Sequence, residues 1–420
     1  MKKTIKLAVV AALALGTTSA FATNGSALIG LGAKSRAMGG TSIGVAHGAE
    51  SGLSNPALIT SVEGTEVSFG GTFFMPNVKN KNNLVVPQGA PGAGTVYNTG
   101  FEKSAADLSV IPEVSIATKI TDNFYMGVGM FGTAGMGVDY RDTAAVQAGG
   151  TQFNMVTNLQ LMQFGVPLAY TVSGFSVAVT PLLQYGSLDI NYVGDDGAGN
   201  AVQNGAGVAQ DLKFGYNLGV SYAVSDFTVG AVYKSQIDMD YKDQLVNAMK
   251  GFGVPYTNTK LSTPAEIGVG MSYAYGASTI ALDYKQIKWS DAKGYEDFKW
   301  EDQNVYALGY EYETKTWALR AGYNYAKSPI SEQKLGSLGA LQSGADMAGL
   351  LNTFNLLGFP GIVESHYTLG GSYALSEQTS VDLAYTYAPE VTNTYKNFVG
   401  QDITTKHSQQ GVSFQLNYDF

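Results

Sequence analysis

The chain has 420 residues and a net charge of −9, with 14% charged residues, 52 glycines, 26 tyrosines and no cysteine. A typical soluble domain carries about 25% charged residues, so this composition suits a protein whose outer surface meets lipid. The acidic balance argues against nucleic-acid binding, which requires a basic face. The lack of cysteine excludes thiolate catalysis, cysteine-zinc sites and disulfides.

Residues 1–22 have the three parts of a secretory signal peptide. Lysines near the start precede a short apolar run, LAVVAALALG, and Ala20-Phe21-Ala22 forms an A-x-A cleavage pattern. The alternative is a membrane anchor, but the apolar run is too short to cross about 30 Å of hydrocarbon. We therefore expect residues 1–22 to be removed and the mature chain to start near Thr23.

Residues 23–62 precede the first strand candidate and are rich in glycine, alanine and serine. They include SRAMGGTSIGVAHGAESGLSNPALIT, which is too irregular for a strand and too rich in glycine for a helix. A segment of small residues can pack inside a β-barrel, and a barrel of about fourteen strands leaks unless its lumen is filled. We therefore predict that residues 23–62 form a plug inside a barrel made by residues 63–420.

From residue 63 onward, apolar and polar residues alternate with the period of a β-strand. In the last segment, Val412, Phe414, Leu416, Tyr418 and Phe420 alternate with serine, glutamine, asparagine and aspartate. The same pattern gives fourteen strand candidates, at 65–76, 108–119, 124–137, 158–172, 175–191, 211–224, 226–239, 263–275, 278–289, 303–313, 315–327, 364–375, 378–388 and 409–420.

The alternation by itself fits either a soluble β-sandwich or a membrane barrel whose apolar face points outward. Aromatic residues gather at strand ends, the strands are about ten residues or longer, and short turns alternate with long loops, all of which favour the barrel. Barrel closure also gives every backbone group a partner in lipid. We predict an all-β fold, a transmembrane antiparallel β-barrel of about fourteen strands with the N-terminal plug in its lumen, in a bacterial outer membrane.

Three stretches spread over most of the mature chain carry a family resemblance. They are NGSALIGLGAKSRAMGGTSIGVAHGAESGLSNPALI, then TPAEIGVGMSY followed by ALDYKQIKWSD, and finally HYTLGGSYALSEQTSVDLAYTY. Together they resemble the FadL/TodX family of outer-membrane transporters for hydrophobic compounds. The resemblance implies that residues 23–62 are the family's hatch, with Asn55, Pro56 and Ala57 as its Asn-Pro-Ala element. The loops depart from the family pattern, so ligand contacts are not transferred.

The resemblance implies passive uptake of a hydrophobic small molecule. The ligand would bind in the extracellular loops, move to a pocket above the hatch and leave sideways through the barrel wall after the hatch rearranges. Long-chain fatty acids are the leading substrate, and aromatic or aliphatic hydrocarbons are the alternative, because no residue decides the head group. A general porin for hydrophilic solutes is the alternative of another class, which the plug and the low charge argue against.

Partners and cofactors follow from the same interpretation. We expect no enzymatic activity, because no residues for it are present, and we expect no cofactor, no metal and no nucleic-acid partner. The expected assembly is a monomer surrounded by outer-membrane lipid, including lipopolysaccharide.

Apolar residues in two long loops are candidates for the first binding groove, because exposed apolar patches usually mark binding surfaces. They are Leu245, Met249 and Phe252 in the loop at 240–262, and Leu350, Leu351, Phe354, Leu357 and Phe359 in the loop at 328–363. The alternative is that the two loops pack together and cap the barrel, and both interpretations can hold at once.

Glycines in the third strand candidate are candidates for the lateral opening, since glycine inside a strand marks a bulge, a bend or a close approach. They are Gly127, Gly129, Gly132 and Gly135. The alternative is that these glycines make room for the hatch.

Three basic residues are candidates for binding the carboxylate of a fatty acid. Lys34 and Arg36 lie in the hatch, and Arg320 is expected to face the lumen. The alternative, which we favour, is that each one pairs with an acidic lumen residue and braces the plug.

Overall fold

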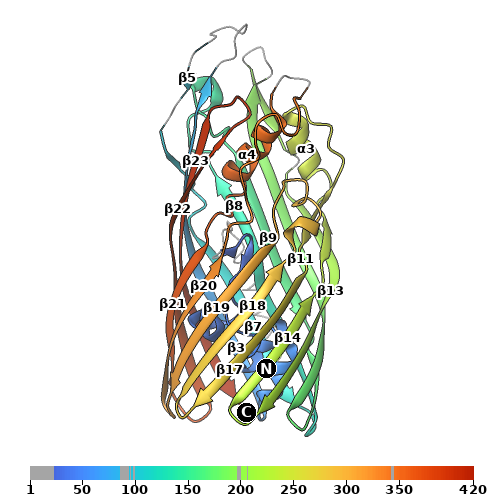
Figure 1. Cartoon of the computed structure of the whole chain (residues 1–420), viewed down its shortest axis with the longest axis vertical. Helices are drawn as coiled ribbons and strands as arrows, with labels where there is room; N and C mark the ends of the chain where they lie inside the picture. Colours follow the sequence, from blue (N-terminus) through green and yellow to red (C-terminus); the bar gives the residue numbers. More distant parts are fainter. Residues whose placement is uncertain are drawn as a thin grey trace, which may run out of the picture.

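The computed structural model describes residues 23–85, 94, 96–97, 100–195, 200–205, 207–341 and 345–420. The predicted signal peptide at 1–22 lies outside the described residues. The structure is a tall barrel with short turns and the C-terminus at one end and long loops at the other (Figure 1).

Within the described residues, fourteen strand runs form the wall, as predicted. Their bounds are β3 (Thr65–Asn82), β7 (Ser109–Lys119), β8 (Phe124–Asp139), β9 (Val156–Gly165) continued by β10 (Leu168–Val172), β11 (Phe175–Asp195), β13 (Ala209–Val224), β14 (Phe227–Lys234), β17 (Glu266–Tyr275), β18 (Ser278–Ile287), β19 (Gln303–Glu313), β20 (Trp317–Ala326), β21 (Ser365–Ala374), β22 (Thr379–Lys396) and β23 (Asp402–Asp419). Each strand pairs antiparallel with the next, and β23 pairs with β3 from Ile403↔Asn82 to Asp419↔Glu66, which closes the barrel.

The alternation along each strand places bulky residues outside and polar residues inside. In β23, Phe414 and Leu416 are 47% and 40% exposed, whereas Gln415 and Asn417 are each 2% exposed. This is the arrangement of a membrane barrel rather than of a soluble sandwich. None of the described helices has the length and apolar character needed to cross a membrane.

Some strand bounds differ from those predicted. β3, β22 and β23 extend well past their predicted limits toward the loop end, because their polar residues, such as those of TNTYK in β22, show no apolar alternation. The predicted strand at 158–172 is divided into β9 and β10 around Pro167, since proline has no amide to donate to a ladder.

Residues 23–62, here called the hatch, lie inside the lower part of the barrel, where they are seen in blue (Figure 1). Their elements are β1 (Thr23–Asn24), β2 (Ala27–Leu28), α2 (Ala33–Ala37) and two 3₁₀ turns, η1 (Gly48–Leu53) and η2 (Pro56–Ser61).

The long loops carry the remaining elements. These are β4 (Leu84–Val85), β5 (Val96–Tyr97), β6 (Glu102–Lys103), η3 (Val146–Ala148), β12 (Ala201–Asn204), β15 (Ile237–Asp240), α3 (Gln244–Gly251), β16 (Lys260–Thr263), η4 (Trp289–Asp291) and α4 (Met347–Leu357). The helices α3 and α4 stand at the top of the barrel (Figure 1).

Candidate functional site

The Asn-Pro-Ala element fixes the hatch against strands β13 and β14. The Asn55 amide donates to the carbonyl oxygens of Ile43, at 2.8 Å, and of Val220, at 3.2 Å. The side-chain carbonyl of Asn55 accepts the Ala57 amide and caps η2. The approach is possible because the wall has glycine here: a Cβ at Gly219 would lie 2.2 Å from the Asn55 Oδ1.

Asp283 of β18 is a second anchor for the hatch backbone. Its Oδ2 accepts the amides of Ser42, at 2.6 Å, and Ile43, at 2.8 Å, and its Oδ1 lies 3.4 Å from the Gly44 amide. Three consecutive backbone N–H groups thus converge on one carboxylate. Charge-assisted hydrogen bonds of this kind are the strong ones, so Asp283 holds the middle of the hatch in place.

Arg36, a predicted head-group candidate, is 3% exposed and forms a two-pronged ion pair with Glu113 of β7. Its Nη1 donates to the Glu113 Oε2 at 2.9 Å and to the Thr72 hydroxyl at 2.8 Å. Both carboxylate oxygens are used by the guanidinium, so this arginine braces the hatch against the wall.

The other two predicted head-group residues also face acids. The Arg320 Nε donates to the Glu311 Oε2 at 2.6 Å, and its Nη1 contacts the Ser372 hydroxyl. Burial lowers the pKa of Lys34, but the neighbouring carboxylates, Asp382 foremost, outweigh this effect and raise it overall. Both cations therefore sit in a lower lumen that is rich in acidic partners.

Two further ionisable residues of the hatch, Glu50 and His47, are buried. Burial raises the pKa of Glu50 to about 8, while Lys34 partly offsets that shift. Burial lowers the pKa of His47 to about 4, although a hydrogen bond with the Thr41 carbonyl favours the charged ring. Protonation of Glu50 therefore favours the docked hatch, whereas protonation of His47 disfavours it.

A small cavity of about 60 Å³ lies between the hatch and the loops. Its walls include Leu28, Leu161, Leu261 and Trp289, together with Lys234, Glu266 and Lys285. An apolar cavity that accepts benzene measures about 150 Å³. An aromatic or longer ligand therefore requires the hatch or the loops to move.

The third wall strand, β8, leaves its neighbour β7 partway up the barrel. The β7–β8 ladder runs from Lys119↔Tyr125 to Glu113↔Phe131, whereas β8 continues to Asp139. The ladder between β8 and β9 persists, but a register shift between Gly132 and Ala134 leaves Thr133 as an extra residue. An extra residue bends a strand, so β8 turns away from β7 above Phe131.

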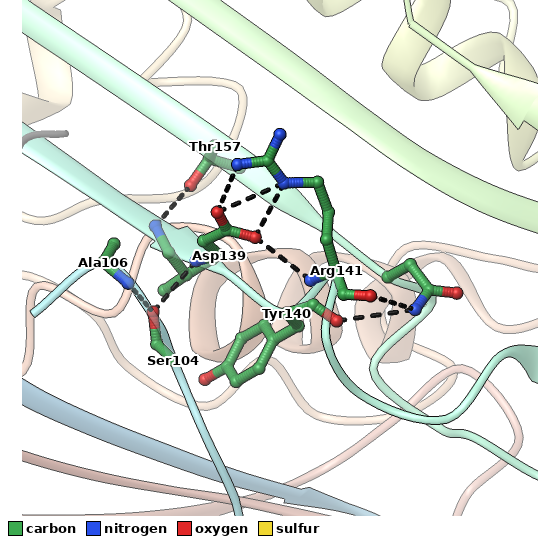
Figure 2. Close-up of polar contacts among 8 residues, drawn as sticks. Ser104, Ala106, Asp139, Tyr140, Arg141 and Thr157 are labelled. Carbon is green, nitrogen blue, oxygen red and sulfur yellow. Dashed lines mark hydrogen bonds and ion pairs between the residues drawn. The ribbon is translucent and has the colours of Figure 1, made fainter. Parts of the chain in front are cut away.

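The wall closes again at the top of β8, as Figure 2 shows. The Ser104 hydroxyl accepts the Asp139 amide at 2.9 Å, and the Ala105 amide donates to the Asp139 carbonyl at 2.8 Å. Arg141 pairs with the Asp139 carboxylate above this contact. We call the part of the wall beside residues 132–138, bounded by these contacts and by the β7–β8 ladder, the wall gap.

The hatch covers the inner side of the wall gap. Ala27 pairs with Ala134, and the Gly135 amide donates to the Ser26 carbonyl at 3.0 Å. The first residues of the hatch therefore take over part of the pairing that β8 loses when it leaves β7.

Apolar side chains line both sides of the wall at the foot of the gap. Outside lies an apolar hollow of about 770 Å³ formed by residues of β3, β7, β8, β9, β11 and β13 and by Val166 between β9 and β10, with Pro181 and Phe214 among them. Inside lies a cluster that joins hatch and wall residues, namely Leu28, Leu31, Leu53, Phe74, Ile111, Phe131 and Leu182. Leu182 lines the outer hollow and also belongs to the inner cluster. Only one layer of side chains therefore separates the hatch from the lipid side.

The four candidate glycines lie in two parts of β8. Gly127 and Gly129 lie in the regular β7–β8 ladder, and a Cβ at Gly129 would be 3.0 Å from the Leu53 side chain of the hatch. Gly132 and Gly135 lie in the wall gap. A Cβ at Gly132 would be 2.7 Å from the Ile111 side chain.

The candidate loop residues are packed together rather than displayed. All but one are at most 4% exposed, namely Leu245, Met249, Leu350, Leu351, Phe354, Leu357 and Phe359. Phe252 is partly buried against the same cluster and stacks on Tyr192 at 4.8 Å between ring centres. We call this cluster the cap, and in this structure its residues cover one another.

Sequence reasoning missed several of these residues. The pattern of β17 places Glu266 on the inner face, but nothing in it pairs Glu266 with Lys234 and Lys285. Asp283 lies in the stretch ALDYKQ, where the alternation of residues places its side chain on the inner face. That placement was the sequence signal for a contact with the hatch. The extra residue Thr133 has no signal, because alternation is ambiguous in GTAGMG.

Fold and site together define a closed outer-membrane β-barrel with a hatch in its lumen. The chain belongs to the family described as outer membrane protein transport protein (OMPP1/FadL/TodX), whose model matches residues 7–336. Members of this family are transport channels and not enzymes. This confirms the family, the fold and the outer-membrane location predicted from the sequence.

Individual relatives are distant. A 47 kDa outer membrane protein of Pasteurella multocida is 25% identical over 413 residues, with 87% of each chain covered. The solved structure of a Pseudomonas aeruginosa FadL homologue matches 94% of this chain and all of its own, with a TM-score of 0.67 at 17% identity. The Pseudomonas putida toluene transporter TodX matches 95% of this chain and all of its own, with a TM-score of 0.67 at 18% identity. These structures show the shared fold.

Proposed function

We propose that this protein is a channel for the passive uptake of hydrophobic small molecules across the outer membrane. The observation that carries the proposal is the wall gap, which lies beside the hatch and above an apolar hollow on the lipid side. A water-filled pore has no use for such a feature. A hydrophobic solute does, because each CH₂ group kept out of water contributes about 0.8 kcal/mol.

The filled lumen supports this function over that of a general porin. A porin needs an open, polar channel, whereas here the hatch is tied to the wall through Asn55, Asp283 and Arg36. The space above the hatch measures about 60 Å³. The described residues of the hatch thus fill the part of the lumen that a porin leaves open.

The route begins at the cap and ends at the wall gap. A ligand exchanges with apolar side chains of the cap, such as Phe252, which is only partly buried. It then enters the cavity above the hatch, and movement of β2 away from β8 opens the wall gap. The apolar cluster around Leu53 and Leu182 leads from there to the lipid side.

Long-chain fatty acids are the leading substrate in this proposal, and aromatic or aliphatic hydrocarbons are the alternative. The likeness to a toluene transporter supports the alternative only through the shared fold, since the identity is 18%. In both cases the protein acts as a monomer in a membrane that contains lipopolysaccharide.

Deletion of Thr133 tests the exit step. Removing this extra residue restores a regular ladder between β8 and β9 while every partner of residues 134–139 in β9 is kept. The strand then straightens toward β7 and closes the wall gap. We expect uptake of a labelled fatty acid by whole cells to fall to background, while binding to the purified protein persists. The matched control is Thr133→Ser, which keeps the extra residue and its hydroxyl and should keep uptake.

Two results contradict the proposal. Undiminished uptake by the deletion variant shows that the wall gap is not the exit. A large steady conductance for hydrophilic ions in planar bilayers, with no saturable binding of any hydrophobic compound, returns the protein to the general porins.

A further inference from the structure

Three lysines lie side by side on neighbouring strands near the loop end of the barrel. Lys79 of β3 is the direct cross-strand partner of Lys103 of β6 on one side and of Lys406 of β23 on the other. Lys81 lies two residues further along β3, so it points to the same face as Lys79. We call these four residues the lysine row.

The lysine row faces away from the lumen. Lys79 lies between Val78 and Asn80, whose side chains are buried on the inner face at 2% and 0% exposure. The Nζ of Lys406 lies over the ring of Phe101, 5.1 Å from its centre, and Phe101 is exposed. The ammonium groups therefore meet whatever surrounds the barrel at this height.

That height is the upper edge of the apolar belt. Val67 lies on the same outer face near the start of β3, where it lines the outer hollow. At about 3.3 Å per residue and a tilt of about 45°, Lys79 stands about 28 Å above Val67. The apolar band of such a barrel is about 25 Å tall. Lys79 therefore stands just above the hydrocarbon, at the level of the lipid head groups.

The lysines outnumber the carboxylates that accompany them. Lys103 pairs with Asp107 at 2.7 Å, and Lys406 pairs with Glu390 at 3.3 Å. The two lysines of β3 have no ion-pair partner in the part of the chain that the structure describes. Like charges directly opposite one another destabilise a sheet. The lysine row therefore costs stability unless an anion lies over it.

Other strands end differently on their outer faces. The upper outward positions of β18 and β19 hold Tyr284, Gln286 and Asn304, and the Tyr284 hydroxyl donates to the Asn304 side chain at 2.8 Å. These residues are neutral and satisfy one another. The positive charge is therefore a feature of the β3 side and not of the whole rim.

The lysine row also borders the closure at the top of the wall gap. β6 is joined to β3 by a ladder of two residue pairs, one of which is Lys79↔Lys103. The next residue, Ser104, accepts the Asp139 amide of β8. An anion that attracts Lys79 and Lys103 together would hold β6 against β3, and with it the contact that closes the wall.

We propose that the lysine row binds the phosphate groups of lipopolysaccharide and thereby fixes β6 at the top of the wall gap. A phosphate monoester carries a charge of about −1.5 to −2 at pH 7, and lysine binds phosphate as a point charge. The acyl chains of the same lipid lie against Phe73 and Val412, which face each other on β3 and β23 below the lysines and are exposed. The inference does not depend on the proposed uptake function.

The test measures lipid binding to the full-length protein in detergent by native mass spectrometry. The probes are lipid A with two phosphates, lipid A with one phosphate, and phosphatidylglycerol. Interactions with charged groups contribute enough that the loss of one phosphate should weaken binding roughly tenfold. Phosphatidylglycerol, which has a phosphodiester with a single charge, should bind more weakly than lipid A with two phosphates.

Substitutions in and beside the lysine row have opposite expected signs. The double variant Lys79→Gln and Lys81→Gln should lose roughly tenfold in affinity for lipid A with two phosphates. Glu390→Gln frees Lys406 and should tighten binding several-fold. The matched control is the double variant Lys242→Gln and Lys250→Gln, which makes the same change in charge at exposed positions of the loop at 240–262. Heat-modifiable migration on gels verifies that each variant is folded.

Hydrogen exchange tests the effect on β6. Addition of lipid A with two phosphates should slow amide exchange at residues 102–105 several-fold in the unaltered protein and in the control variant. The variant without the two lysines of β3 should show no such slowing. Slowing of the same size in that variant would overturn the role of the lysine row at the wall gap.

Three further results overturn the proposal. Equal loss of affinity in the two double variants would reduce binding to general charge attraction. Equal binding of phosphatidylglycerol and of lipid A with two phosphates would overturn the assignment to lipopolysaccharide. Equal binding of the two forms of lipid A would remove the phosphates from recognition. None of these results bears on whether hydrophobic compounds cross the barrel.

Discussion

The lower and upper parts of the lumen are filled by different chemistry. The hatch is held by polar contacts with the wall: Asp283 of the wall accepts hatch amides, and Asn55 of the hatch donates to the Val220 carbonyl of the wall. The cap is held by buried aliphatic and aromatic groups such as Phe354, which stacks on Phe298 at 4.9 Å between ring centres.

The contrast indicates which part can move at low cost. A neutral hydrogen bond of the hatch contributes about 1 kcal/mol net, since water can replace it, while the buried Arg36–Glu113 ion pair costs more to break. Displacing the cap exposes apolar area at about 25 cal/mol per Å², unless an apolar ligand takes its place. The hatch therefore responds to polar groups and protons, whereas the cap responds to hydrophobic ligands.

The largest expected effect follows from Glu113→Ala, which leaves the buried Arg36 without its ion-pair partner. Breaking such a pair costs about 4 kcal/mol, so the hatch should undock. The chain has no cysteine, so a single Ser54→Cys, buried in the hatch, reports undocking by its rate of thiol labelling. Glu63→Ala, at an exposed carboxylate, is the control. Equal labelling in both variants would show that the ion pair does not hold the hatch.

Phe354→Ala tests the cap, the upper of the two parts compared. Removing a buried phenylalanine costs about 3 kcal/mol, and the loss should be confined to the cap. We expect faster proteolytic cleavage in the loop at 328–363 with unchanged labelling of Ser54→Cys. Leu338→Ala, in the same loop and 40% exposed in the parent, should have no effect. Faster labelling of the hatch in the Phe354 variant would contradict the separation of the two parts.

Asp283→Ala tests the polar contacts that hold the hatch. Three hatch amides lose their acceptor, but water can enter the lumen, so the expected loss is about 2 kcal/mol. Labelling of Ser54→Cys should accelerate, while cleavage of the cap stays the same. Asp291→Ala, at an exposed carboxylate, provides the control. Unchanged labelling would show that Asp283 does not anchor the hatch.

The smallest effect is the pH dependence of hatch docking. The pKa of His47 falls from 6.5 to about 4 on burial, so its contribution is present above pH 6.5 and is lost as pH falls toward 4. The pKa of Glu50 rises from 4.5 to about 8, so its contribution is present below pH 4.5 and is lost as pH rises through 8. Labelling should therefore be slowest at intermediate pH.

Substitutions at Glu50 and His47 show which residue causes the alkaline rise in labelling rate and which causes the acid rise. Glu50→Gln should abolish the alkaline rise in labelling and retain the acid one, and His47→Gln should do the reverse. A profile that neither substitution alters would assign the pH dependence to other groups.

Much of the wall follows from local sequence, because each outward position needs an apolar residue and each inward position tolerates a polar one. This is why Phe414 and Gln415 could be placed on opposite faces. Where β22 rises past the apolar belt, its outward positions become polar, as at Thr392 and Thr394, and the periodic signal disappears. The strand continues because its backbone pairing with β23 does, and periodicity does not report backbone pairing.

The site is less predictable, since its geometry depends on packing between distant segments. Arg36 was recognised as a buried cation, but its partner Glu113 lies 77 residues away. The loop residues were recognised as apolar, yet composition does not decide whether Phe354 covers Phe359 or awaits a ligand. The single residue Thr133 redirects β8, and a glycine-rich strand hides the change of face.

The long strands β3, β22 and β23 each have 18 residues, whereas about ten suffice to span an outer membrane. At about 3.3 Å per residue and a strand tilt of about 45°, the surplus raises one side of the barrel by about 20 Å above the hydrocarbon. The upper part of β23 therefore carries the cap away from the hydrocarbon, with the Thr405 hydroxyl bonded to the Leu356 carbonyl of α4.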